Sequence, residues 1–64
     1  MLKRNAQVEV QTEDRSFFGF FRESNEDFLV IRGTVGDNIG KDILIPVRLI
    51  LCVIVHTPVG RDDS

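Results

Sequence analysis

Two residues of this chain, Cys52 and His56, belong to types that commonly support catalysis. A cysteine nucleophile needs a base beside it in a polarised, partly open site. Cys52 lies instead among Leu51, Val53 and Ile54, a setting typical of a small buried hydrophobic side chain. His56 follows the same run, and the sequence places no acid beside it. We therefore expect a solvent-facing or hydrogen-bonded histidine, with a role at a pore or ligand as the alternative.

The other residues do not complete a catalytic or metal-binding set. One cysteine and one histidine are too few for a cysteine-based zinc cage, and the sequence contains no other metal-ligand cluster. No nucleophile is accompanied by both a base and an acid. The sequence therefore predicts a protein that is not an enzyme and that has no cofactor.

A glycine-rich segment, GDNIGKD at residues 36–42, is similar to a phosphate-binding loop. The spacing between its glycines is one residue too short for that motif. Asp42 stands where a hydroxyl residue would hold magnesium, and no helix pattern follows. We interpret residues 33–41, which contain three glycines, as a flexible hairpin loop.

The elements that must position any site are organised around residues 43–55, ILIPVRLILCVIV, which only Pro46 and Arg48 interrupt. This run is shorter than the about 20 apolar residues of a membrane span, so we expect no membrane partner. Its many β-branched residues favour strands. Residues 49–55 do not alternate between apolar and polar, so both faces need cover, and a chain of 64 residues supplies a core to only one.

A second copy of the protein is the simplest source of the missing cover. The residues that we expect at this interface between subunits are Ile43, Leu44 and Ile45 of one strand and Leu51, Cys52, Val53, Ile54 and Val55 of the next.

The length of the chain also favours oligomerisation. A single domain of 64 residues buries only about 60% of its unfolded surface and usually needs disulfides, metal or oligomerisation. One cysteine allows no internal disulfide, so oligomerisation is what remains.

A net charge of −2 argues against a strongly electrostatic nucleic-acid binder, although an assembly would repeat a small basic patch. The first residues show no signal peptide, which predicts a cytoplasmic protein with a reduced thiol.

Apolar and polar residues alternate in short runs, and a helical period appears nowhere. We predict a polar segment over residues 1–7 with little or no helix, a barrel over residues 8–56 and a flexible tail over residues 57–64. Pro46 should end the fourth strand because it cannot donate a hydrogen bond. The predicted strands are residues 8–12, 17–22, 28–32 and 42–45, and a fifth from Ile50 or Leu51 to His56.

Five short strands predict an all-β fold, a strongly bent antiparallel SH3-like open barrel whose last two strands form exposed edges. The second strand carries four of the five phenylalanines around Gly19, where we expect the sheet to bend. Because side chains alternate along a strand, one of Phe18 or Phe20 should face away from Phe17 and Phe21. That outer aromatic would form a second interface or a platform for a base.

The second hairpin resembles the first signature segment of the Sm-like (LSm/Hfq-like) family, and lies closest to the bacterial branch, the RNA chaperone Hfq. The matching residues are Phe17, Gly19, Phe21 and Asn25, followed by the apolar strand at residues 28–31. The run at residues 43–55 resembles the second signature segment, which is a short strand, a tight turn and a last strand. The resemblance covers roughly residues 7–56 and implies the Sm fold.

The resemblance also implies a partner. Sm-like proteins form closed rings, here expected to contain about five to seven subunits, in which the fourth strand pairs with the fifth strand of the neighbour. They bind single-stranded, uridine-rich or adenine-rich RNA around the pore, through the loop after strand two and the loop between strands four and five. The residues that this places on RNA are Asn25, Phe28 and Arg48, with Gln7, Lys3 and Arg4 flanking the same face.

The chain departs from the family in these loops. Asn25 stands where most members carry Asp, and Asp27 aligns with a position used for base stacking, with Phe28 next to it. Pro46 and Val47 replace the Lys-His pair of Hfq. Arg48, displaced by one residue, would substitute, because a guanidinium stacks on bases and binds phosphate.

Two functions follow from this reading. The first is a ring-forming Sm-like protein that binds single-stranded RNA, with a role as an RNA chaperone or in RNA processing. The alternative is a homo-oligomeric SH3-like interaction scaffold without RNA binding, which the acidic charge and the missing Lys-His pair favour.

Overall fold

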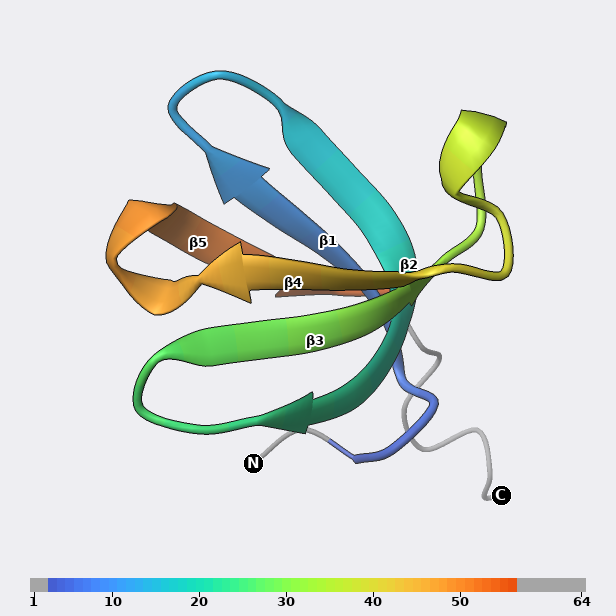
Figure 1. Ribbon diagram of the computed structural model, residues 1–64, viewed down its shortest axis with the longest axis horizontal. Coiled ribbons are helices and arrows are strands. Elements are labelled where there is room, and N and C mark those ends of the chain that lie inside the picture. Colours follow the sequence, from blue (N-terminus) through green and yellow to red (C-terminus); the bar gives the residue numbers. More distant parts are fainter. Residues whose placement is uncertain (1–2, 57–64) are drawn as a thin grey trace.

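The computed structural model describes residues 3–56 as one antiparallel sheet of five strands (Figure 1). The predicted tail at residues 57–64 lies outside the described residues, as do Met1 and Leu2. The five strands are β1 (Gln7–Thr12), β2 (Ser16–Ser24), β3 (Phe28–Gly33), β4 (Asp42–Pro46) and β5 (Ile50–Val55). Two single-turn 3-10 helices, η1 (Gly36–Asn38) and η2 (Val47–Leu49), precede β4 and β5. The predicted all-β class and the five strands are confirmed.

The local signals in the sequence mark the strand ends well. Pro46 is the last residue of β4, as predicted, and Val47 begins the turn to β5. The predicted loop at residues 33–41 contains η1, and residues 3–6 contain no helix. None of the helices in the described part of the chain is long and apolar enough to cross a membrane.

The strand order is β4-β3-β2-β1-β5, so the sheet does not close and β4 and β5 form its edges. These two strands were predicted to be the exposed edges. Figure 1 shows the turn between β1 and β2, the turn between β2 and β3 and the turn at η2 together at one end of the molecule, with η1 at the other. The sheet therefore presents two free edges and one end built from turns.

Gly19 lies where β2 belongs to both halves of the sheet. It pairs with Val8 of β1 and with Gly33 of β3. A Cβ atom at Gly19 would lie within 2.3 Å of the carbonyl oxygen of Arg32. The glycine thus permits a close backbone approach, which is one of the roles of a glycine inside a strand. The register between β2 and β3 shifts at another point of β2, between Phe21 and Glu23.

The core fills one face of the bent sheet. Buried residues alternate along the strands, as they must when one face is covered. They are Ala6, Val8, Val10, Phe21, Leu29, Ile31 and Ile45. Ile43, Ile50, Val53 and Phe17 pack against them while remaining partly exposed.

Three expectations about single side chains need correction. Both Phe18 and Phe20 face away from the core, each 39% exposed, because residues two apart share a face. Cys52 is exposed rather than buried, since β5 is an edge strand and only its inner side chains reach the core. Ile45, expected at the interface between subunits, is only 2% exposed and fills the core of its own chain.

Candidate nucleic-acid interface

Asn25 builds the turn between β2 and β3. Its side-chain oxygen Oδ1 accepts hydrogen bonds from the backbone N–H of Asp27 at 2.7 Å and of Phe28 at 2.9 Å. Its own N–H donates to the carbonyl oxygen of Phe28 at 2.9 Å. This is the local side-chain capping for which Asn is favoured in turns. The Oδ1 atom therefore already accepts two hydrogen bonds within the turn, and the structural role of Asn25 is to fix the position of Phe28.

The turn at η2 lies directly beside this turn. The backbone N–H of Val47 donates to the carbonyl oxygen of Asp27 at 2.9 Å, and Phe28 pairs with Pro46. Phe28 and Arg48 are both exposed at this end. The structure thus brings together Asn25, Phe28 and Arg48, the three residues of the two loops that the family resemblance predicted to contact RNA.

The other three candidates lie elsewhere. Thr12, the last residue of β1, and Arg48 line the same surface hollow. Gln7 is the first residue of β1 and therefore lies at the other end of that strand. At about 3.4 Å per residue, the length of β1 separates Gln7 from that hollow by about 17 Å. Lys3 and Arg4 precede Ala6, whose carbonyl oxygen accepts from Phe21 N–H at 2.8 Å in β2. The described part of the chain therefore does not place these three residues beside the Arg48 turn.

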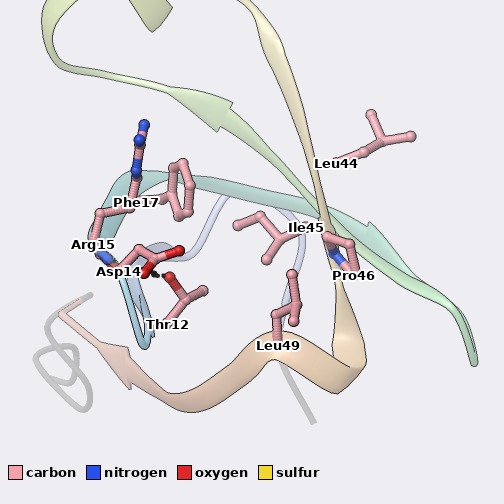
Figure 2. A pocket seen from close by; sticks show the side chains of 8 residues that line it. All are labelled: Thr12, Asp14, Arg15, Phe17, Leu44, Ile45, Pro46 and Leu49. Carbon is pink, nitrogen blue, oxygen red and sulfur yellow. Dashed lines mark hydrogen bonds between the residues drawn. The ribbon is translucent and has the colours of Figure 1, made fainter.

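Two adjoining hollows, of about 140 and 190 Å³, open at this end of the sheet. In the first, Phe17, Ile45 and Leu49 point inward while Leu44 points away (Figure 2). The guanidinium carbon of Arg15 lies 5.9 Å from the centre of the Phe17 ring, which is within the range of a cation–π contact. The remaining residues lining the two hollows are Thr12, Glu13, Asp14, Pro46, Arg48 and Leu51.

The charges of the turns at this end are mostly negative. The turn after β1 carries Glu13 and Asp14, and the turn after β2 carries Glu26 and Asp27. The cations of these turns are Arg15 and Arg48. Because counterion release from phosphates drives general RNA affinity, an acidic surplus weakens that contribution. Any RNA bound here must be held mainly by stacking and by contacts to base edges.

A chain of hydrogen bonds crosses from β5 to β1 on the outer face of the sheet. The Cys52 thiol donates to Gln11 Oε1 at 3.2 Å, and Gln11 Nε2 donates to Glu9 Oε2 at 3.0 Å. The other carboxylate oxygen, Glu9 Oε1, lies 3.2 Å from His56 Nε2. The expectation that His56 has no acid beside it is therefore wrong. The thiol contacts an amide and not a base, and the described residues contain no group of three or more metal-ligating side chains.

Acid is expected to weaken the fold through Glu9. The hydrogen bond from Gln11, followed by the one from His56, lowers the pKa of Glu9 below its ordinary value. A carboxyl group whose pKa is lower in the folded state stabilises the fold above its unfolded pKa, and this contribution disappears as the pH falls through the folded value. Urea unfolding of the wild type and of Glu9→Gln, from about pH 6 to about pH 3, should show the steeper loss in the wild type. Parallel curves would contradict a role for this carboxylate.

Comparison with protein-family models, with curated proteins and with solved structures gives no match to this chain. A function must therefore be inferred from the residues themselves and from their geometry.

Proposed function

We propose that this chain is an Sm-like protein that closes into a homo-oligomeric ring and binds single-stranded RNA at the end formed by its turns. The observation that carries the proposal is the apolar character of both free edges. Leu44 on β4 is 57% exposed and Leu51 on β5 is 69% exposed. Val55 and Ile54 continue the exposed apolar surface along β5. Long apolar edges of this kind promote pairing with another chain.

A closed ring is the assembly that satisfies both edges. β4 and β5 lie at opposite ends of the strand order, so pairing β4 of one subunit with β5 of the next is a head-to-tail contact. Such contacts produce a ring when the rotation closes and an open filament when it does not. Closure leaves no edge unpaired, and the resemblance implies a ring of about five to seven subunits.

The ring would present the turn residues to RNA in many copies. Phe28 and Arg48 are exposed on two adjoining turns, which a backbone hydrogen bond between Asp27 and Val47 holds together. An aromatic ring and a guanidinium plane both stack on unpaired bases. Each site alone is weak, and repetition around a ring raises the overall affinity by multivalency. This arrangement suits an RNA chaperone or an RNA-processing protein.

A homo-oligomeric interaction scaffold that binds no RNA is the second candidate. The acidic surplus of the turns at residues 13–15 and 25–27 favours it, because those turns share the end that carries Arg48. The edge contact between subunits is common to both candidates. RNA binding therefore separates them.

Titration of labelled oligo(U) and oligo(A) tests the RNA function. We expect the wild type to bind one of them with an affinity that falls with salt, and Arg48→Ala to weaken binding by roughly tenfold or more, because every copy in the ring loses its cation. Lys41→Ala, which removes one positive charge in the loop at the opposite end, is the matched control and should change affinity less than about twofold. Failure of the wild type to bind either RNA would support the scaffold.

A further inference from the structure

The smaller of the two hollows, of about 140 Å³, combines apolar walls with a carboxylate. Phe17, Ile45 and Leu49 form the walls, and the Asp14 carboxylate turns toward them (Figure 2). Within residues 3–56 this carboxylate has no hydrogen bond or ion pair. The neighbouring Thr12 hydroxyl, in contrast, already donates to the carbonyl oxygen of Arg15 at 2.9 Å. The Asp14 carboxylate is therefore available to a ligand that enters the hollow.

The size and lining of the hollow suit a flat ring. An engineered cavity of about 150 Å³ lined by Leu, Ile and Phe holds one molecule of benzene. The adjoining hollow of about 190 Å³ shares Thr12, Asp14 and Leu49 with the first, which leaves room for a base of two fused rings. Phe17 supplies an aromatic face, and every base can stack on such a face. Stacking alone thus does not choose among the bases.

The carboxylate supplies the choice. An ionised carboxylate only accepts hydrogen bonds, and its two oxygens accept two at once. Guanine carries two donors side by side on one edge, N1–H and the N2 amino group. Uracil carries one donor between two carbonyl oxygens, while adenine and cytosine carry an amino group beside an acceptor nitrogen that a carboxylate repels. Guanine is therefore the base whose Watson–Crick edge matches Asp14.

Two arginines lie beside the hollows. The Arg15 guanidinium carbon is 5.9 Å from the centre of the Phe17 ring, and its side chain extends away from Asp14 (Figure 2). Arg48 lines the second hollow together with Glu13. Both arginines are exposed, and a guanidinium binds phosphate, so these side chains are available to the RNA backbone beside a bound base.

From these observations we propose that Asp14 and Phe17 form a site for one guanine of a single-stranded RNA. The inference rests on the proposed RNA function and names the base that a uridine-rich or adenine-rich RNA must contain to bind most tightly. The guanine site adjoins the proposed RNA site, because Arg48 and Asp14 line the same hollow. One acidic residue of this end thereby acts in base recognition rather than against RNA binding.

Titration of labelled RNA tests the guanine site. Three oligonucleotides of equal length are compared: the homopolymer that the wild type binds, oligo(U) or oligo(A), the same RNA with one internal guanine, and the same RNA with inosine at that position. We expect guanine to raise the affinity at least about fivefold, because a matched pair of hydrogen bonds discriminates between bases by that factor or more. Inosine lacks the N2 amino group and should lose most of the gain.

Asp14→Asn should abolish the preference for guanine, because an amide presents a donor and an acceptor where the carboxylate presents two acceptors. Asp14 is exposed, so the variant should fold, and urea unfolding checks that it does. Glu26→Gln removes the same charge from an exposed side chain of the neighbouring turn and is the matched control. It should keep the full preference. The ratio of the two affinities is compared, so that a general effect of the lost negative charge cancels.

The possible results separate the two proposals. Equal affinity for the RNA with and without guanine would overturn the guanine site and leave the RNA function intact. Failure to bind any of the three RNAs would overturn the RNA function, and the guanine site with it. A guanine preference that Asp14→Asn retains would place the base elsewhere and overturn the assignment to this hollow. Binding of an arginine-rich peptide that Asp14→Asn abolishes, without any preference for guanine, would assign the hollow to a basic protein segment and also overturn the inference.

Discussion

Leu51→Asp is expected to convert the proposed ring into soluble monomers. Leu51 is 69% exposed in the single chain, so an aspartate there leaves the core of its own subunit untouched. At a joined edge, the same carboxylate would be buried against the apolar β4 of the neighbour, and an unpaired buried charge costs about 3 kcal/mol or more. Each contact should weaken roughly 10²-fold. Light scattering across a tenfold dilution measures the outcome.

Ile39→Asp is the control for this experiment. Ile39 is 64% exposed and lies in the loop between η1 and β4, outside both edge strands. It places the same charge on an equally exposed aliphatic position, and we expect the mass of the assembly to remain that of the wild type. A wild type that is already monomeric, or a Leu51→Asp variant that keeps the full mass, would contradict pairing through the edges.

Gly19→Ala is expected to destabilise the fold by about 3 kcal/mol or more. The added Cβ would lie 2.3 Å from the carbonyl oxygen of Arg32 and 2.9 Å from its carbonyl carbon. Both are backbone atoms of β3, so relief requires the two strands to separate where β2 serves both halves of the sheet. A domain of this size has little stability to lose, and we expect a substantial unfolded population. Urea unfolding at one protein concentration measures the change.

Gly36→Ala provides the comparison. Gly36 has a φ of 61°, and an added Cβ would meet nothing within 4 Å. The substitution should cost about 1–2 kcal/mol of stability, because alanine must adopt a left-handed backbone conformation, but it creates no steric clash. Equal losses of unfolding free energy for Gly19→Ala and Gly36→Ala would show that the contact with Arg32 is not what makes Gly19 necessary.

The candidate site shows where a pattern in the sequence is enough and where it is not. Asn25, Phe28 and Arg48 come together because two tight turns at the same end of neighbouring strands must meet once β3 and β4 pair. Gln7 was expected on the same face, yet it is the first residue of β1 and lies at the end of that strand opposite to these turns. A position relative to a distant turn depends on strand direction and length, and these belong to the assembled sheet.

The short-range features of this protein were determined by its sequence alone. Alternation marked the strands, polar clusters and glycines marked the turns, and Pro46 ended β4, because each signal acts through the nearest few residues. The long run at residues 43–55 also identified the two strands that form the edges. An apolar run that does not alternate with polar residues needs cover on both faces, and one small chain covers only one of them.

The tertiary structure alone decided which distant residues meet. Glu9 and His56 are 47 residues apart, and Gln11 and Cys52 are 41 apart. Both contacts depend on the register between β1 and β5, which shifts at Gln11 and Thr12. A shift of one residue would turn these side chains to the other face. That register is set by packing of the whole core, and the same packing left Cys52 exposed and Ile45 buried.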